Sequence, residues 1–230
     1  QDLFVALHKI HFPNNLSDAN DARKRLSFDE LFLMQISAAI RKEEWNKKLK
    51  GNSFKIDKFK KEIDKFIKNL PFTLTNAQKK TTEEIFKDLY SDKPMNRLLE
   101  GDVGSGKTVV AAISIYLAYL NGFQSVFMAP TEILAQQHYK TISNLLEPFG
   151  LKIGLQTGSK KVLNTKYKML NTDVLIGTHA VISEKIKFDK LGLVIIDEQQ
   201  RFGVEQRSLL RKKGNNPHVL TMTATPIPRT

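Results

Sequence analysis

GDVGSGKT, at residues 101–108, is the most informative stretch of the sequence. A short β-rich run at residues 97–99 precedes it, and the residues from Thr108 to Leu120 are apolar enough for a buried helix. A strand, a glycine-rich turn that ends in Lys-Thr, and a helix form the context that the pattern G-x-x-x-x-G-K-[ST] requires. Glycines let backbone N–H groups surround phosphate oxygens without Cβ clashes, and a helix N-terminus favours an anion. The stretch therefore predicts a binding site for a nucleoside triphosphate.

The positions of this loop have separate expected roles. The ammonium group of Lys107 reaches the β- and γ-phosphates, and the hydroxyl of Thr108 is a Mg²⁺ ligand. The predicted nucleotide-binding residues of the loop are Gly101, Asp102, Val103, Gly104, Ser105, Gly106, Lys107 and Thr108.

After Leu70-Pro71 the sequence alternates between short β-rich runs and stretches with helical periodicity. The expected strands are 97–99, 125–129, 152–156, 173–177, 193–196 and 218–222. The alternation predicts an α/β fold, with a mostly parallel sheet covered by helices on both faces. In such folds ligands bind at the carboxyl ends of the strands, where the motifs of this chain fall. We therefore expect a P-loop NTPase lobe over residues 71–230.

A pair of acidic residues follows the apolar run Leu191–Ile196. Asp197 is predicted to hold the Mg²⁺ ion, and Glu198 to orient and deprotonate the attacking water. Acidic residues after a strand are also common as helix caps, so the pair indicates catalysis only in combination with the P-loop. We predict catalytic roles for Lys107, Asp197 and Glu198.

The overall composition limits the classes of protein to consider. The net charge of +12 and a pI near 9.7 favour a polyanionic partner such as nucleic acid. Cysteine is absent, which excludes disulfides and agrees with a reducing cytoplasm, and the five histidines have no metal-ligand spacing. No apolar run approaches the roughly 20 residues of a membrane span. The chain opens with Gln1, and we expect it to be a piece of a longer protein.

Residues 1–70 differ in pattern and predict a helical lead-in. One helix is expected from Ser17, its N-cap, to about Lys50, and a second from about Lys55 to Asn69, because apolar residues recur at three- and four-residue steps. Residues 41–68 contain 11 Lys+Arg and 5 Asp+Glu, a net charge of +6. We interpret this charge as a solvated helix face, with a DNA-facing patch as the alternative.

Several turns resemble the motifs of superfamily-two helicases. Residues 197–200 (DEQQ) resemble their D-E-x-x box, residues 223–225 (TAT) their third motif, and residues 129–137 (APTEILAQQ) motif Ia. Residues 177–180 stand at the place of motif Ib, and residues 157–159 resemble another turn that contacts the nucleic-acid backbone. The resemblance implies nucleic-acid contacts for Pro130, Thr131, Gly158, Ser159, Thr178 and His179. It implies that nucleotide state is coupled to nucleic-acid grip by Gln200, Thr223, Ala224 and Thr225.

Thr75 and Gln78 have two interpretations. Thr-x-x-Gln is a capping box for the helix that precedes the P-loop strand. Phe72, Thr75 and Gln78 also resemble the Q-motif, whose glutamine recognises adenine while the aromatic ring stacks nearby. Both hold only if capping leaves the glutamine side chain available. We favour adenine recognition by Phe72 and Gln78, which makes ATP the expected nucleotide.

Within superfamily two, the resemblance points to the RecG family. The runs DEQQRFGV at 197–204 and TATPIPRT at 223–230 are similar to RecG and to the transcription-repair coupling factor, and the segments 11–13 and 25–32 are similar to RecG. Gln200 stands where RecG sequences usually have His. The resemblance implies the first RecA-like lobe of an ATP- and Mg²⁺-dependent translocase on branched double-stranded DNA, such as forks and Holliday junctions, in recombination and repair. A coupling factor, an RNA helicase and a non-catalytic ATP-gated scaffold are the alternatives.

The same resemblance implies parts of the motor outside these residues. A wedge domain is expected before Gln1, and a second lobe with an arginine finger after Thr230. Such a finger contributes about 10³–10⁵ in rate in comparable phosphoryl-transfer enzymes. We therefore expect the 230-residue chain on its own to hydrolyse ATP barely, if at all.

Overall fold

The computed structural model describes residues 2–48, 50–158, 161–162, 172–183, 186–198, 213–214 and 216–224. The chain divides into two compact units, residues 1–49 and 50–230. This division lies earlier than the boundary at residue 70 that the sequence led us to expect. Residues 50–70 belong to the second unit because they pack on its helices, as shown below.

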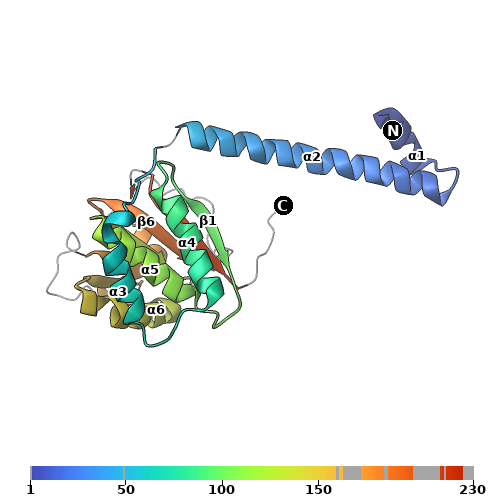
Figure 1. The fold of residues 1–230 in the computed structure, drawn as a ribbon. Coiled ribbons are helices and arrows are strands. Elements are labelled where there is room, and N and C mark those ends of the chain that lie inside the picture. Colours follow the sequence, from blue (N-terminus) through green and yellow to red (C-terminus); the bar gives the residue numbers. More distant parts are fainter. Residues whose placement is uncertain are drawn as a thin grey trace. The chain divides into compact units, whose positions relative to one another are not determined.

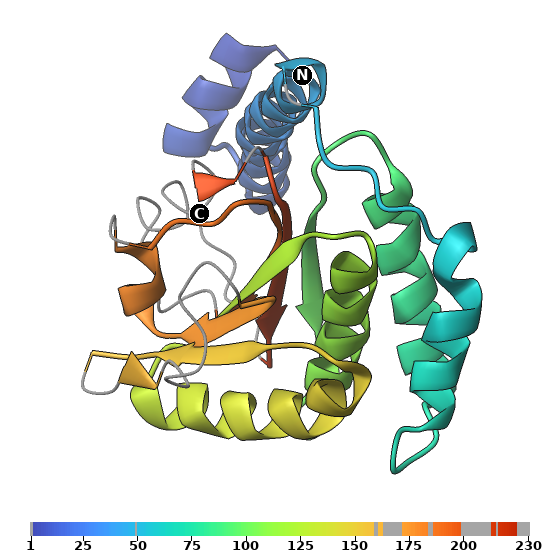
Figure 2. The ribbon, with the colours of Figure 1, turned by 90° about the vertical axis from the view of Figure 1, so that its left-hand side faces the viewer.

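The second unit is built on one seven-stranded sheet (Figure 2). The strands are β1 (Asn96–Glu100), β2 (Gln124–Met128), β3 (Ile153–Gln156), β4 (Lys161–Val162), β5 (Val174–Gly177), β6 (Leu191–Asp197) and β7 (His218–Thr223). Their order is β1-β7-β6-β2-β5-β3-β4, and every neighbouring pair is parallel except β3 and β4. The six predicted strands are confirmed. The short antiparallel edge strand β4 was not predicted.

Helices cover one face of this sheet (Figure 1). They are α4 (Asn76–Tyr90), α5 (Lys107–Leu120) and α6 (Glu132–Leu146), which is followed by the 3-10 turn η2 (Glu147–Phe149). Ten consecutive residues of α5, Val109 to Ala118, are buried, since this helix lies between α4 and α6 and against β2 and β6. Phe127 of β2 and Ile195 of β6 point into the same core. The P-loop helix is thus the central element of the fold.

Alternate residues of the central strands point to the opposite face. Val126 of β2 and Val194 and Ile196 of β6 form a second, smaller apolar cluster there, as expected for strands buried on both sides. Among the described residues this cluster is closed by the 3-10 turn η4 (His179–Ile182) and Ile186. Residues 199–212, between β6 and β7, lie outside the described residues.

Residues 50–70 are part of the α/β unit. They form the 3-10 turn η1 (Asp57–Phe59) and helix α3 (Lys60–Lys68). Phe54 and Phe66 are almost fully buried, and the ring of Phe66 lies 4.9 Å from that of Tyr116 in α5. The backbone N–H of Phe54 also donates to the carbonyl of Leu89 in α4 at 2.8 Å. These non-local contacts attach α3 to the sheet-covering helices.

The first unit consists of α1 (Leu3–His11) and α2 (Leu16–Lys48). Lys9 and Asp18 form an ion pair at 2.8 Å, and Ala6 and Ala22 are fully buried. The side chain of Asn15, not that of Ser17, accepts the backbone N–H of Asp18 at 2.8 Å. The predicted N-cap was therefore wrong by two positions, and α1 was not predicted. Within the described ranges, no helix of the chain combines the length and the apolar character that crossing a membrane requires.

Candidate nucleotide and strand-binding site

The P-loop joins β1 to α5. Gly104 and Gly106 have φ values of 81° and 85°, a left-handed conformation that glycine adopts without strain. Gly106 precedes the first residue of α5, and a Cβ at this position would collide with the side chain of Gln78. Residues 102–105 are exposed. The loop is therefore exposed and left-handed at two glycines, as expected of a phosphate-binding loop, and a side chain at 106 would be strained and would also displace the carboxamide of Gln78.

Lys107 holds its ammonium group against this loop. Its Nζ donates to the carbonyls of Gly101 at 2.6 Å and Asp102 at 2.9 Å. An ammonium group has three donors, so these two bonds leave one for a phosphate oxygen. The lysine is thus already placed in the loop rather than extended into solvent.

Gln78 is committed at both ends of its carboxamide. Its Oε1 accepts the backbone N–H of Thr75 at 2.9 Å, while the hydroxyl of Thr75 accepts the backbone N–H of Gln78 at 3.2 Å, which completes the capping box. Its Nε2 donates to the carbonyl of Ser105 in the P-loop at 2.8 Å. These bonds use one lone pair of Oε1 and one N–H of Nε2 and leave one of each, so recognition of adenine by Gln78 stays a prediction. Phe72 is about half exposed, at 49%.

The acidic pair lies at the end of β6. Asp197 is 8% exposed, and its Oδ2 is 2.8 Å from Nε2 of His138. Glu198 has a φ of 52°, which is rare for a residue with a side chain and costs about 1–2 kcal/mol. Its carboxylate accepts the hydroxyl of Thr223 and the backbone N–H of Ala224, both at 3.2 Å. Backbone strain of this kind is concentrated at functional sites.

Strand order brings these motifs together. β7 lies between β1 and β6. The turn after β7 therefore lies between the P-loop, which follows β1, and the acidic pair, which stands at the end of β6. The backbone N–H of Gly101 donates to the carbonyl of Thr223 at 3.3 Å, and that of Glu198 to the carbonyl of Met222 at 2.8 Å. Of the predicted coupling residues, Thr223 thus contacts both the P-loop and Glu198, and Ala224 contacts Glu198. Gln200 and Thr225 lie outside the described residues.

The predicted strand-contacting turns occupy the adjoining part of the same sheet edge. They follow β2, β5 and β3, which are neighbours in that order. Thr131 caps α6 by accepting the backbone N–H of Leu134 at 3.3 Å, and a Cβ on Gly158 would lie 3.1 Å from Oε1 of Glu132. The side chain of Glu132, the residue after Thr131, therefore lies beside Gly158. Ser159 is outside the described residues.

The turn after β5 is part of this row as well. The backbone N–H of Thr178 donates to the carbonyl of Gln156 at the end of β3, at 3.2 Å. Thr178 is 3% exposed, whereas the side chain of His179 is exposed. Of these two predicted contacts, only His179 presents its side chain to solvent.

His138 is a site residue that the sequence reasoning missed. It was grouped with four other histidines that lack metal-ligand spacing. The available signal was its position seven residues after Thr131, since seven residues are about two turns and return to nearly the same helix face. The contact of this helix face with Asp197 depends on the sheet, in which β6 lies beside β2.

The chemistry of the site is compatible with magnesium. Mg²⁺ keeps several waters and binds through one or two carboxylates together with substrate phosphates, rather than in an all-protein cage. Asp197, at the end of β6, would supply the carboxylate, and Thr108, in the first turn of α5, the hydroxyl. The described part of the chain contains no cluster of three or more His, Cys, Asp or Glu residues that could hold a metal.

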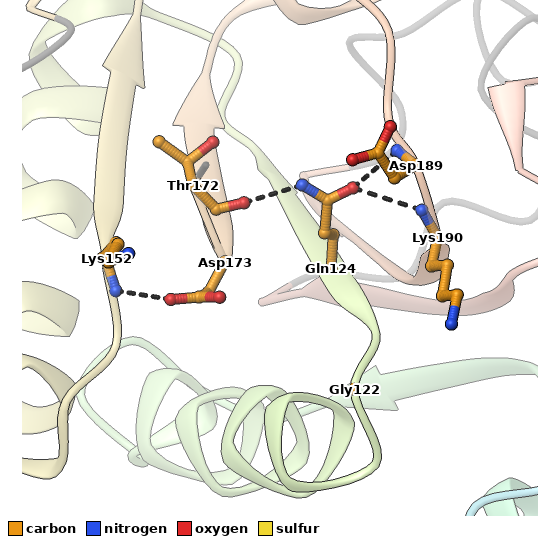
Figure 3. A pocket seen from close by; sticks show the side chains of 7 residues that line it. All are labelled: Gly122, Gln124, Lys152, Thr172, Asp173, Asp189 and Lys190. Atoms are coloured by element: carbon orange, nitrogen blue, oxygen red, sulfur yellow. Dashed lines mark hydrogen bonds between the residues drawn. The ribbon is translucent and has the colours of Figure 1, made fainter. Parts of the chain in front are cut away.

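A hollow of about 440 Å³ lies at the amino ends of the strands. Figure 3 shows that the carboxamide of Gln124 bridges its walls: Nε2 donates to the carbonyl of Thr172, and Oε1 accepts the backbone N–H groups of Asp189 and Lys190. Lys152 donates its backbone N–H to the carboxylate of Asp173. These polar groups hold the starts of four strands together. The hollow lies at the edge of the sheet opposite the P-loop.

The whole chain is similar to known helicases. It is 46% identical to the ATP-dependent DNA helicase RecG of Streptococcus pneumoniae serotype 4, over 98% of this chain and 34% of that protein. It is 48% identical to RecG of Thermotoga maritima, over 97% of this chain and 29% of that protein. The chain thus spans about a third of the length of these relatives.

Solved structures agree with these relatives. A RecG bound to a three-way DNA junction superimposes with a TM-score of 0.81 and 45% identity, over 97% of this chain and 30% of that one. A hypothetical ATP-dependent RNA helicase from Sulfolobus tokodaii, at 21% identity and a TM-score of 0.57 over 73% of this chain and 51% of that one, shares the fold. The model of the DEAD/DEAH box helicase family matches residues 75–230. The chain therefore belongs to the DEAD/DEAH box helicase family.

Proposed function

We propose that this chain is the first motor lobe of an ATP-driven translocase that acts on branched double-stranded DNA, in recombination and repair. The observation that supports it most is the single sheet edge on which the P-loop, the acidic pair, the turn 223–224 and the strand-contacting turns meet. The similarity to RecG along 98% of the chain supports the choice of DNA. The net charge of +12 agrees with a polyanionic partner.

Each side chain of the nucleotide site has a proposed task. Lys107 and the backbone N–H groups of the P-loop bind the phosphates, and Thr108 and Asp197 hold Mg²⁺. The ion, when bound, neutralises charge on the phosphate oxygens. Glu198 accepts a proton from the attacking water, and its hydrogen bonds to Thr223 and Ala224 orient the carboxylate for that task.

ATP is the proposed nucleotide, through Phe72 and Gln78. Gln78 would offer the second N–H of Nε2 and the second lone pair of Oε1 to the adenine edge. Because Nε2 also donates to the carbonyl of Ser105, adenine binding would be linked to the conformation of the P-loop through this side chain. Because the proposed partner is DNA, we also propose that the protein works in the cytoplasm. We further propose that a second lobe completes the nucleotide site.

The test is the ATPase rate of the full-length parent protein with and without four-way junction DNA. Junction DNA should stimulate the rate strongly, and Lys107→Ala should abolish activity because the phosphates lose their ammonium partner. Glu198→Gln should still bind ATP but hydrolyse it about 10²–10⁴-fold more slowly. Lys190→Ala is the matched control, since this exposed lysine lies at the opposite edge of the sheet.

Two outcomes would move the proposal elsewhere. Stimulation by RNA rather than DNA would assign the motor to RNA, and stimulation by unbranched duplex alone would favour a coupling-factor type of translocase. Full ATPase activity of the Lys107→Ala variant would reject the nucleotide site itself.

A further inference from the structure

The contact between His138 and Asp197 joins two predicted sites, the strand-contacting turn at the start of α6 and the Mg²⁺ site at the end of β6. His138 comes from α6, whose first turn contains the predicted strand-contacting Thr131. Asp197 is the predicted Mg²⁺ ligand at the end of β6. Their side chains are 14% and 12% exposed, and Nε2 lies 2.8 Å from Oδ2. The contact is therefore a sheltered hydrogen bond rather than a surface ion pair.

The direction of this hydrogen bond follows from the acceptor. An ionised carboxylate only accepts, so Nε2 carries the proton. Each carboxylate oxygen has two lone pairs, so a bond to Oδ2 leaves the carboxylate able to bind a metal or its water. Hydrogen-bond partners of ligating groups set the orientation of those groups and typically change metal affinity or activity by about 10–100-fold when removed.

The ring of His138 is held on its other side as well. Its centroid lies 4.6 Å from that of Phe127, a fully buried residue of β2. Phe127 is paired in register with Ile195 of β6, two residues before Asp197. The imidazole is thus wedged between the sheet and the carboxylate, which restricts the positions that its Nε2 can take.

Helix α6 is a stiff connection between the two sites. His138 lies seven residues after Thr131, about 10 Å along the helix axis and on nearly the same face. Between and beyond them, Ala135 and Ile142 are fully buried against the sheet. Because core packing tolerates little deformation, a displacement of the N-terminus of α6 shifts His138 with it. A nucleic-acid strand bound at Thr131 could therefore act on Asp197 through α6 and His138.

We propose that His138 is a positioning residue: it orients Asp197 for Mg²⁺ and links the strand-contacting end of α6 to the metal site. This rests on the proposed function, in that it takes Asp197 as the Mg²⁺ ligand and Thr131 as a strand contact. It adds a residue and a coupling route to which no motif identified in the sequence assigns a role.

The experiment measures how much Mg²⁺ the full-length protein needs to bind a fluorescent ATP analogue, without hydrolysis as the readout. His138→Phe keeps a ring against Phe127 but removes the donor, and it should raise the Mg²⁺ concentration for half-maximal binding by about 10–100-fold. His138→Gln keeps a donor at a similar reach and should restore most of the wild-type value. An unchanged Mg²⁺ requirement in His138→Phe would overturn the proposal.

Junction DNA provides the second measurement. In the wild type, DNA should change the Mg²⁺ requirement, and by reciprocity Mg²⁺ with nucleotide should change DNA affinity by the same factor. In His138→Phe that ratio should fall to about 1, and a ratio equal to that of the wild type would reject the coupling route. If His138→Phe fails to fold, His138→Gln is compared with His138→Asn, which is one methylene too short; equal Mg²⁺ requirements in these two variants would overturn the proposal.

The two proposals fail differently. A wild type that binds the nucleotide analogue without any need for Mg²⁺, or whose ATPase ignores nucleic acid, removes the proposed function and the role of His138 with it. A wild type that behaves as proposed, beside an unaltered His138→Phe, removes only the inference about His138.

Discussion

Among single side chains, His218 shows how one buried polar residue joins distant segments. Its Nδ1 accepts the backbone N–H of Met95 at 2.9 Å, and its Nε2 donates to the carbonyl of Asn52 at 2.5 Å. It is fully buried at the start of β7, with the ring of Phe54 packed edge-on at 4.9 Å. Burial lowers the pKa of His218, against smaller opposing effects of the Asn52 carbonyl and the Asp88 carboxylate. The neutral imidazole is therefore the folded form.

This predicts a pH dependence of stability. The unfolded histidine has a pKa near 6.5 and the folded one a lower pKa, so the unfolded chain binds the proton more readily. The free energy of unfolding should be constant with respect to this group above pH 6.5. It should then fall by up to about 1.36 kcal/mol per pH unit until the pH reaches the folded-state pKa.

Urea unfolding of the chain between pH 8 and pH 5.5 measures this effect, with the range kept above the titration of most carboxylates. His218→Gln should be less stable at pH 8, because the two hydrogen bonds are weakened, but should show a shallower decline. The prediction fails if the variant and the wild type decline with the same slope.

Among elements, α3 determines where the α/β unit begins. The helix is highly charged on its outer side, so by composition it resembles the lead-in, and only Ile63 and Phe66 are buried. The rings of Tyr116 and Phe149 lie 4.9 and 5.0 Å from that of Phe66. A few apolar contacts of this kind are enough to attach a helix of charged composition to the α/β unit, because burying one large apolar side chain stabilises the fold by about 1.5–3 kcal/mol.

The corresponding prediction compares two phenylalanines. Phe66→Ala should lower the free energy of unfolding by about 3–5 kcal/mol, since it removes a buried ring and leaves a cavity. Phe28→Ala in α2 is the control: this ring is 59% exposed, and its loss should change stability by no more than about 0.5 kcal/mol. Equal effects in denaturant unfolding would show that α3 does not belong to the α/β unit.

For the molecule as a whole, the main fact is that the chain spans only part of the length of its relatives. The chain matches about a third of the RecG of Streptococcus pneumoniae, and the groups that it brings to the nucleotide site all lie at one edge of one sheet. The family resemblance places an arginine finger on a second lobe. A P-loop, an acidic pair and a metal ion without such a finger bind nucleotide but stabilise the transition state poorly.

The ATPase rate of this 230-residue chain should therefore be about 10³–10⁵-fold below that of the full-length protein on junction DNA. Binding of a fluorescent ATP analogue with Mg²⁺ should remain detectable and should be lost in Lys107→Ala. A turnover equal to that of the full-length protein would show that the lobe needs no partner for catalysis.

The sequence alone was sufficient to predict the fold class, the six parallel strands, the P-loop with its flanking strand and helix, and the helicase family. These features depend on local patterns: runs of β-branched residues, helical periodicity, and glycines at positions of positive φ. The roles of the individual site residues remain proposals, but the sequence did indicate that their motifs follow strands that end at one edge.

Other features required the tertiary structure. The division of the chain after Leu49 rests on contacts of Phe54 and Phe66 with helices far along the chain. The link between Gln78 and the P-loop rests on its hydrogen bond to the carbonyl of Ser105. His138 meets Asp197 across 59 residues only because β6 inserts beside β2. A sequence pattern records what a residue does with its near neighbours, whereas these contacts depend on strand order, which is set by the packing of the whole sheet.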